Sequence, residues 1–311
     1  MSSNISTREA YGRALAEFGE ENENIVVLDA DVSKCTMTVH FAKKFPNRFF
    51  NVGISEADMV TTAAGLAACG KTAFVSAFAV FAAGRAFDQI RNSVAYPKLN
   101  VKIAATHAGV TVGEDGGSHQ AIEDIALMRA LPNMVVISPA DTTEAKASVK
   151  AAIEYNGPVY LRLGRPAQPI IFNEETYRFE LGKGSVLKDG NDVTVISTGI
   201  MTSKALEAAN VLKEQGINAR VINIHTIKPI DKDILIKAAA ETKGIVTVED
   251  HSVIGGLGSA VAEVLMQNYP ARLKMIGIND TFGESGSPNE LMQIFGLTVD
   301  NIVFNVKDLL K

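Results

Sequence analysis

Short β-branched runs alternate with helical patterns along nearly all of this 311-residue chain, and this alternation restricts its fold more than any other feature. Strands separated by helices indicate βαβ units on parallel sheets. The predicted strands are residues 25–28, 101–105, 134–137, 159–163, 193–197, 219–223 and 244–249.

A polar stretch rich in proline and glycine interrupts this pattern between Pro166 and Asn191. We therefore expect an α/β protein with two doubly wound parallel-sheet domains, at residues 1–170 and 191–311, joined by a linker at 171–190. Ligands of such sheets bind at the carboxyl ends of strands, so the loops that follow strands are the places to seek chemistry.

Charge and composition argue against several classes of function. The 35 acidic and 30 basic residues give a formal net charge of −5, without the basic excess that binding to nucleic acid needs. Two cysteines, Cys35 and Cys69, are too few for a disulfide scaffold and fit a reducing compartment. The start of the sequence shows no signal-peptide pattern, and the longest apolar stretch, 73–83, is too short to cross a bilayer. We expect a cytoplasmic protein that binds neither nucleic acid nor membrane.

Glu56 is the first candidate site residue. It follows a short apolar strand and opens an alanine-rich helix that runs towards Ala68. A carboxylate in the first turn of a helix also has a purely structural explanation, because it interacts favourably with the helix dipole. Taken alone, Glu56 favours that structural explanation.

The loop at residues 105–120 holds two histidines, two acidic residues and four glycines, before a helix that we expect to begin near Ser118. Ordering so flexible a loop costs conformational entropy, so its polar residues indicate a site held by a rigid scaffold. A solvated glycine-rich turn is the alternative. A zinc site is a weaker one, because His107 and His119 lack the close paired spacing of zinc motifs.

An aromatic-rich stretch occupies residues 74–91. Phe78 and Phe81 are three apart and would share one helical face, which is typical of core packing. Arg85 and Asp88 continue the same apolar segment, and buried charges need partners.

The second half of the chain has one polar cluster, Glu249-Asp-His251, followed by Gly255-Gly-Leu-Gly258. A phosphate loop is one interpretation. We favour a strand-to-helix turn that packs at a subunit interface.

Together these segments resemble the transketolase family over nearly the whole chain, in an order and spacing more specific than any single motif. The motifs that carry the resemblance are Ser6-Thr-Arg-Glu-Ala-Tyr-Gly12, Leu28-Asp-Ala-Asp31, Gly53-Ile-Ser-Glu56, Arg85-Ala-Phe-Asp-Gln-Ile-Arg91, Thr106-His-Ala-Gly109, Gly113-Glu-Asp-Gly-Gly-Ser-His119, Leu163-Gly-Arg-Pro166, Thr226-Ile-Lys-Pro-Ile-Asp231 and Val248-Glu-Asp-His-Ser252.

Thiamine diphosphate lies between two domains in that family, one holding the diphosphate through a divalent cation and a Gly-Asp-Gly motif, the other holding the aminopyrimidine. No such motif with its downstream Asn is found here, since Asp115-Gly-Gly117 lies in the histidine loop, and the sequence starts directly in a pyrimidine-domain pattern. The resemblance therefore implies the C-terminal subunit of a split enzyme, with the pyrimidine-binding domain at 1–170 and the transketolase C-terminal domain at 191–311. Its partner would be an N-terminal subunit that holds Mg²⁺ or Ca²⁺, leaving no metal ligand in this chain. An α2β2 assembly is the expected form.

The resemblance also assigns cofactor-binding roles. It gives Glu56 the carboxyl group that hydrogen-bonds the pyrimidine nitrogen N1′, so that the cofactor can form its ylid. Phe78 and Phe81 match the aromatic pair that packs on the pyrimidine ring, and Asp31 matches a residue near the thiazolium ring.

Substrate roles follow in the same way. His107 matches a residue facing the substrate and its phosphate, and His119 a second catalytic imidazole near the carbonyl oxygen. Asp115 matches a residue that accepts from a sugar hydroxyl. Arg8 and Arg165 match two guanidinium groups that clamp the sugar phosphate.

Two departures from the family pattern stand out. Cys35 occupies a position where family members often have serine, and a thiol donates more weakly to phosphate. The chain is also one residue longer between Phe81 and Arg85, which leaves the aromatic partner of the pyrimidine ring open.

The function implied is transfer of a two-carbon ketol unit from a ketose phosphate to an aldose phosphate, as in the pentose phosphate pathway. Subunits like deoxyxylulose phosphate synthase or the β subunit of 2-oxo acid dehydrogenases are the enzymatic alternatives, and a non-catalytic partner subunit is the third. The loop from Thr106 to Gly116 favours a transketolase. Ionisable residues at so many strand ends argue against a subunit without catalysis.

Overall fold

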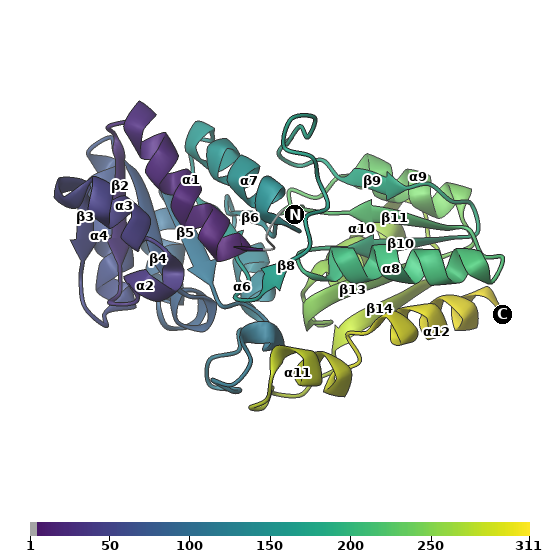
Figure 1. Ribbon diagram of the computed structural model, residues 1–311. Helices are drawn as coiled ribbons and strands as arrows, with labels where there is room; N and C mark the ends of the chain where they lie inside the picture. Colours follow the sequence, from purple (N-terminus) through teal and green to yellow (C-terminus); the bar gives the residue numbers. More distant parts are fainter. Residues whose placement is uncertain (1–4) are drawn as a thin grey trace.

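A computed structural model describes residues 5–311, which form two α/β units lying side by side (Figure 1). The first unit is built on a seven-stranded sheet of order β12-β6-β7-β5-β4-β2-β3, and the second on a five-stranded sheet of order β14-β13-β10-β11-β9. Within these sheets the strands pair in parallel, except that β12 runs antiparallel to β6 and β9 antiparallel to β11. The predicted α/β class is confirmed, and each sheet carries one antiparallel edge strand.

The elements of the first half run from β1 to β7. They are β1 (Ile5–Ser6), α1 (Thr7–Glu21), β2 (Ile25–Asp29), α2 (Ser33–Thr36), α3 (Val39–Lys44), β3 (Phe49–Asn51), α4 (Glu56–Ala68), β4 (Thr72–Phe78), α5 (Phe87–Gln89), β5 (Val101–Thr106), α6 (Asp124–Ala130), β6 (Val135–Ile137), α7 (Thr142–Glu154) and β7 (Val159–Arg162). Two π-helical segments flank α5, η2 (Val80–Arg85) and η3 (Ile90–Ala95), and a short 3₁₀ turn, η4 (Val110–Val112), follows β5.

The elements of the second half run from β8 to α12. They are β8 (Ala167–Gln168), β9 (Ser185–Lys188), β10 (Val193–Ser197), α8 (Met201–Glu214), β11 (Ala219–Asn223), β12 (Thr226–Lys228), α9 (Lys232–Glu241), β13 (Ile245–Ser252), α10 (Leu257–Asn268), β14 (Leu273–Ile278), α11 (Pro288–Ile294) and α12 (Val299–Leu310).

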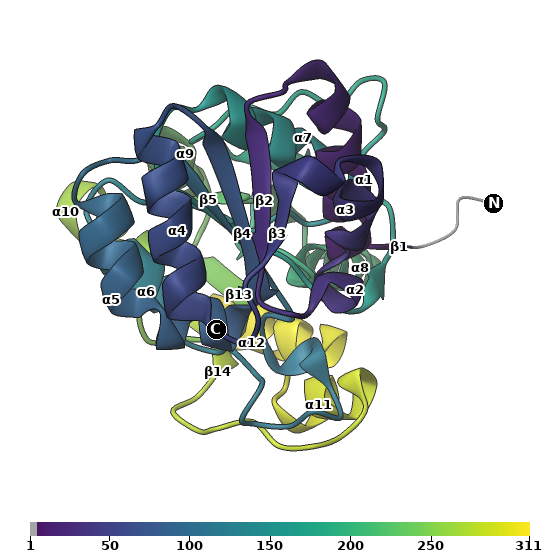
Figure 2. The ribbon, with the colours of Figure 1, turned by 90° about the vertical axis from the view of Figure 1, so that its left-hand side faces the viewer.

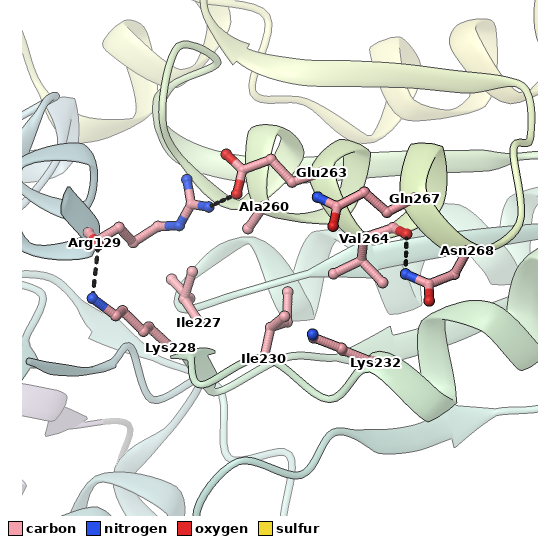
Figure 3. Close-up of a pocket in the computed structure, with 10 residues that line it drawn as sticks. All are labelled: Arg129, Ile227, Lys228, Ile230, Lys232, Ala260, Glu263, Val264, Gln267 and Asn268. Carbon is pink, nitrogen blue, oxygen red and sulfur yellow. Dashed lines mark hydrogen bonds and ion pairs between the residues drawn. The ribbon is translucent and has the colours of Figure 1, made fainter. Parts of the chain in front are cut away.

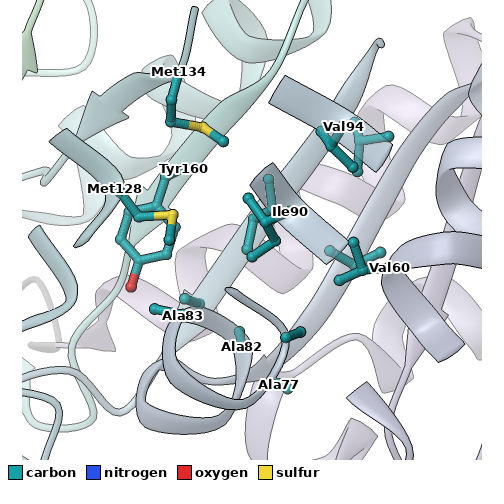
Figure 4. Packing of buried hydrophobic residues seen from close by; sticks show 14 of the residues in the cluster. Val60, Ala77, Ala82, Ala83, Ile90, Val94, Met128, Met134 and Tyr160 are labelled. Carbon is teal, nitrogen blue, oxygen red and sulfur yellow. The ribbon is translucent and has the colours of Figure 1, made fainter. Parts of the chain in front are cut away.

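The inner strands of the first sheet are buried on both faces, as strands of a parallel sheet usually are, whereas the edge strand β3 is partly exposed. Side chains alternate along β2, so that Val27 packs with Tyr11 of α1 on one face, and Leu28 packs with Met59 of α4 on the other. Figure 2 shows α4, α5 and α6 on one side of this sheet, with α1 and α3 opposite. Figure 4 shows the apolar cluster on the α4 side, around Ile90.

Three details differ from the expectations. The helix expected near Ser118 is α6, which begins only at Asp124, because the side chain of Gln120 is tied to loop carbonyls and the chain turns before the helix. The stretch expected to link the two domains, 171–190, includes β9, an edge strand of the second sheet. The second half also returns a strand, β12, to the first sheet. Within residues 5–311, no helix is both long and apolar enough to cross a membrane.

Helix α1 is capped by Ser6, whose hydroxyl accepts a hydrogen bond from the Glu9 amide at 3.3 Å. The side chain of Glu9 binds Arg13, at 2.5 Å, on the next turn. Gly12 faces the turn between α2 and α3 so closely that a Cβ atom there would lie 2.3 Å from the carbonyl oxygen of Met37. Glycine is therefore required where α1 meets this turn.

We predict that Gly12→Ala lowers the free energy of unfolding. Overpacking against backbone costs about 1–3 kcal/mol, which outweighs the roughly 0.5–1 kcal/mol that alanine gains over glycine inside a helix. Gly65→Ala in α4 is the matched control, because a Cβ atom at Gly65 meets no atom within 4 Å and should stabilise the chain. Urea unfolding of both variants measures the difference. Equal stability of the two variants would contradict the close approach.

Candidate active site

The candidate site lies where neighbouring strands of the first sheet end. Strands β3, β2, β4 and β5 are adjacent and parallel, so the segments that follow them meet at one edge of the sheet. These segments carry Glu56, Asp31, Phe81 and His107 respectively. The topology thus brings together residues that lie up to 76 positions apart.

Glu56 is the first residue of α4, and only 3% of it is exposed. One carboxylate oxygen accepts a hydrogen bond from Nη1 of Arg85 at 2.7 Å. The guanidinium carbon of Arg85 lies 4.4 Å from the centroid of the Phe81 ring, and half of the Arg85 side chain is exposed. Glu56 is therefore more than a helix-end charge on the surface, because it is a buried carboxylate whose ionic partner covers an aromatic ring.

Phe78 and Phe81 do not share a helix, and that prediction is wrong. Phe78 ends β4, because the buried run 72–78 pairs with β2 and β5, whereas Phe81 lies in the π-helical turn η2. Their rings still lie nearly parallel, 6.2 Å apart and at 14°. A π-turn holds one residue more than an α-turn, which gives the extra residue between Phe81 and Arg85 a place.

The two histidines of the loop contact these rings. The imidazole of His107 stacks on Phe78 with centroids 3.9 Å apart, and that of His119 meets the Phe81 ring edge-on at 5.2 Å. His119 also lies 6.3 Å from Phe78. The loop after β5 and the turn after β4 therefore form one continuous surface.

His107 is buried and held in a single tautomer. Nη1 of Arg8 lies 3.3 Å from Nε2 of His107, and a guanidinium can only donate, so Nε2 accepts. The proton then sits on Nδ1, which donates to the hydroxyl of Thr106 at 2.8 Å. Burial, and after it the charges of Arg8 and Arg165, lower the pKa of His107 to about 3. His107 is thus a neutral imidazole beside two cations.

Arg8 lies in the first turn of α1 and also donates to the carbonyl oxygen of Cys35 at 2.7 Å. Position 35 therefore meets Arg8 through its backbone, a contact that serine would make equally well. The Cys35 thiol itself is exposed.

Arg165 follows β7 and reaches back to the loop after β5. Its Nη1 donates to the carbonyl oxygen of Val112 and to Glu114, at 3.1 Å from the glutamate oxygen. Asp115 lies 3.8 Å from the same nitrogen. Arg165 and Asp115 thus sit together at the outer side of the loop.

Asp31 follows β2 and is turned towards the neighbouring strand β3. Asn51 donates to its carboxylate at 2.9 Å, and the Asp31 amide donates to the Asn51 side chain at 3.1 Å. Apart from Arg165 and Asp115, the other predicted residues fall into two groups joined by the phenylalanine rings. In one, Arg85 links Glu56 to Phe81, which contacts His119, and in the other Arg8, His107 and Phe78 lie together.

Chemically, this arrangement offers a buried carboxylate, two aromatic rings, two imidazoles and a pair of guanidinium groups. The carboxylate and the aromatic rings fit an aromatic ligand at one end of the site. The guanidinium groups fit an anionic ligand at the other end. Residues 5–311 contain no group of three or more His, Cys, Asp or Glu side chains arranged to hold a metal ion.

Two residues that were not predicted as site residues, Arg85 and Asp250, also contact the site. The sequence marked Arg85 only as a charge in need of a partner, and that partner is Glu56. Asp250 contacts the amide of Val110 from 140 positions away, a separation for which the sequence carries no local signal.

The glycine-rich turn at 255–258 is not free to bind phosphate. Glu249 accepts hydrogen bonds from the amides of Leu257 and Gly258 at the start of α10, at 2.6 and 2.8 Å. Its carboxylate occupies the position that an anion would need. This contact favours the strand-to-helix turn that we expected.

A pocket of about 270 Å³ lies away from this site, between α6, β12 and α10 (Figure 3). Two of its three cations, Arg129 and Lys228, have protein partners. Arg129 binds Glu263 at 2.7 Å and the carbonyl oxygen of Gly255 at 2.6 Å, and Lys228 donates to the carbonyl oxygens of Arg129 and Leu131. The contacts of Arg129 join α6 to the second unit, whereas those of Lys228 stay within the first, and none of the predicted site residues lines the pocket.

Two family models match the chain. Residues 3–169 match the pyrimidine binding domain of transketolase, and residues 182–302 match the transketolase C-terminal domain.

Several known proteins are similar over nearly the whole chain. A protein of Methanocaldococcus jannaschii, provisionally named as a transketolase C-terminal section, is 54% identical over 98% of this chain and 96% of its own. A 6-deoxy-6-sulfo-D-fructose transketolase subunit of a Clostridium species is 44% identical over 95% of this chain and 92% of its own. Human transketolase is 38% identical over 98% of this chain, which spans 49% of the human protein.

Solved structures agree with these relatives. A split-gene transketolase, described as an inactive β4 tetramer, has a TM-score of 0.91 and 56% identity, covering 99% of both chains. Transketolase from Pichia stipitis in complex with sedoheptulose 7-phosphate has a TM-score of 0.83 and 26% identity, covering 99% of this chain and 46% of that one.

We predict that the His107 ring stays neutral between pH 5 and 8 with its proton on Nδ1, because its pKa is lowered to about 3. Long-range ¹H–¹⁵N NMR of the histidine-labelled chain measures both properties, and His107→Gln identifies the signal. A ring that titrates near pH 6.5, or that carries its proton on Nε2, would contradict the contact with Arg8.

Proposed function

The chain belongs to the transketolase family, and we propose that it is the C-terminal, pyrimidine-side subunit of a split transketolase. The observation that carries this proposal is the buried Glu56 beside the Phe81 ring, next to a loop in which two imidazoles and two guanidinium groups meet. The chain spans nearly all of the M. jannaschii protein and of the split-gene transketolase, but about half of human transketolase. This coverage supports a separate partner for the other half.

The reaction we propose is transfer of a two-carbon ketol unit from a ketose phosphate to an aldose phosphate. Family membership implies dependence on thiamine diphosphate, which supplies the electron sink that breaking a bond next to a carbonyl requires. The residues present fit this cofactor, because the buried carboxylate of Glu56 is linked through Arg85 to Phe81, one of two near-parallel aromatic rings. A flat heteroaromatic ring with a basic nitrogen needs such surroundings.

Glu56 is proposed to hold a proton against the aminopyrimidine nitrogen N1′. Arg85 donates to Oε2 of Glu56, which leaves the second carboxylate oxygen, Oε1, to face the cofactor. Phe78 and Phe81 would pack on the pyrimidine ring, and Asp31 would stand near the thiazolium ring.

The substrate side is proposed to be read by charge and hydrogen bonds. Arg8 and Arg165 would bind the sugar phosphate, since a planar guanidinium fits phosphate oxygens in a bidentate manner. The neutral His107 keeps an accepting Nε2, which can take a hydrogen bond from a sugar hydroxyl once Arg8 turns to the phosphate. His119 would contact the carbonyl oxygen, and Asp115 would accept from a second hydroxyl.

The remaining parts of the proposal concern organisation. The pyrimidine-binding domain would comprise residues 1–170. The C-terminal domain would comprise residues 191–311 together with β9, which lies within the expected linker 171–190. An N-terminal subunit would hold the diphosphate and Mg²⁺ or Ca²⁺, in an α2β2 assembly located in the cytoplasm.

We predict that the chain converts xylulose 5-phosphate and ribose 5-phosphate only when mixed with the diphosphate-binding partner, thiamine diphosphate and Mg²⁺. The reason is that this chain supplies only the pyrimidine side of the cofactor site. A coupled assay of sedoheptulose 7-phosphate formation measures it. Turnover by this chain alone would exclude a split enzyme, and turnover of pyruvate instead of the ketose would exclude a transketolase.

We also predict that Glu56→Gln lowers kcat of the mixture by at least about 100-fold, the usual contribution of a general acid or base. Asp58→Asn is the matched control, because Asp58 lies in the same first turn but is exposed. It should change kcat little. If both variants retain full kcat, Glu56 has only the structural role of a helix-end charge.

A further inference from the structure

Asp250 belongs to the second sheet but binds the loop that carries the candidate substrate residues. It lies in β13 and is 3% exposed. Its Oδ1 accepts a hydrogen bond from the Val110 amide at 2.9 Å, and its Oδ2 accepts from the Thr111 hydroxyl at 2.7 Å and from the Thr111 amide at 3.4 Å. One buried carboxylate thus fixes two consecutive residues of the first domain.

The loop is shaped to receive this carboxylate. Gly109 has φ +80°, and a Cβ atom there would lie 2.1 Å from Oδ2 of Asp250. Only glycine combines this backbone conformation with the close approach of the carboxylate. The Gly109 amide is bound in turn by the carbonyl oxygen of Ala121 at 2.8 Å. The loop is therefore clamped on both sides of the carboxylate.

The clamp lies directly beside the candidate site. Only two residues separate His107 from Val110, and His107 itself has a left-handed backbone, with φ +58°. Such a conformation is unfavourable for a residue other than glycine and persists only where surrounding contacts impose it. Among the contacts that the second sheet makes with this loop, the carboxylate of Asp250 is the one nearest to His107 along the chain.

The charge of Asp250 is compensated within the protein. Burial raises the pKa of its carboxyl group, whereas Arg162, the Thr111 hydroxyl and the two loop amides favour the ionised form. Nη2 of Arg162 also donates to the Asp250 carbonyl oxygen at 2.9 Å. A buried carboxylate that accepts three hydrogen bonds is expensive to leave without them, so it resists movement of the loop.

The preceding residue provides a contrast. Glu249 and Asp250 are both buried carboxylates on β13, and neighbouring side chains of a strand point to opposite faces. Glu249 binds the start of α10 within its own domain, whereas Asp250 binds the loop of the other domain. Loss of either carboxylate should destabilise the second domain, but only loss of Asp250 releases the loop.

We propose that Asp250 is a positioning residue for the transketolase reaction, which sets the loop 107–119 so that His107 and Asp115 meet the sugar phosphate. The C-terminal domain then contributes to the active site through the backbone of Val110 and Thr111, without touching the substrate. This inference rests on the proposed function.

Asp250→Asn and Thr111→Val test it in the complex with the diphosphate-binding partner, thiamine diphosphate and Mg²⁺, with Glu249→Gln as the matched control. Small displacements of positioning groups cost up to about 100-fold in rate, so Asp250→Asn should lower kcat/KM for xylulose 5-phosphate by about 10- to 100-fold. Thr111→Val should have a smaller effect in the same direction. Glu249→Gln should keep the kcat/KM of the wild type.

A second measurement distinguishes an effect of the variants on the position of the loop from an effect on the cofactor half of the site. Exchange of the C2 proton of bound thiamine diphosphate, followed by NMR in D₂O, needs Glu56 and not the loop, so it should be unchanged in Asp250→Asn. Amide hydrogen exchange of residues 110–113 in the isolated chain should accelerate in Asp250→Asn and in Thr111→Val, but not in Glu249→Gln.

The outcomes are distinct. The inference is overturned if Asp250→Asn and Thr111→Val match Glu249→Gln in kcat/KM, or if C2 exchange falls in proportion to kcat/KM. If Asp250→Asn does not fold, Thr111→Val decides, because it keeps the carboxylate and both amides. If the wild-type mixture shows no ketol transfer, the proposed function is overturned instead. Unchanged amide exchange of residues 110–113 in Asp250→Asn would then overturn the clamp independently.

Discussion

The buried ion pair between Arg162 and Asp124 is the interaction on which the arrangement of the two sheets depends. Arg162 of β7 donates to Asp124 of α6 at 2.8 and 3.2 Å, and Tyr160 donates to the same carboxylate at 2.7 Å. Burial alone would raise the pKa of Asp124, but the neighbouring Arg162 lowers it. Because Arg162 also donates to the backbone of Asp250 in β13, the pair joins the first sheet to the second. Breaking such a pair from one side typically costs about 3–5 kcal/mol.

This junction divides the candidate site into two parts with different supports. The proposed cofactor side, with Glu56, Arg85 and Phe81, is built by the first sheet alone. The loop on the proposed substrate side follows β5 of the first sheet and is also held from the second unit, by Asp250 and by the carbonyl oxygen of Glu284, which accepts from Gln120 at 2.9 Å. A change in how the two sheets pack would therefore move the substrate side first and leave the cofactor side in place.

The predictable parts of this architecture are those that short sequence patterns encode. The seven predicted strands, the start of α4 at Glu56 and the histidine loop follow from runs of apolar residues and the breaks after them, whereas β4, β9, β12 and β14 were not predicted. Phe78 was assigned to a helix because a spacing of three fits a helix as well as a strand that ends in a turn. The partners of Glu56 and Val110 lie 29 and 140 positions away, and only the folded sheets bring them close. A single sequence carries no signal for such contacts.

The central claim is that this chain builds one side of a thiamine diphosphate site and that the rest comes from another chain. Isothermal titration with thiamine diphosphate and Mg²⁺ tests it most directly, first on the chain alone and then on the chain mixed with its diphosphate-binding partner. The account predicts no saturable binding by the chain alone and one cofactor per pair of chains in the mixture. Equally tight binding by the isolated chain would contradict it.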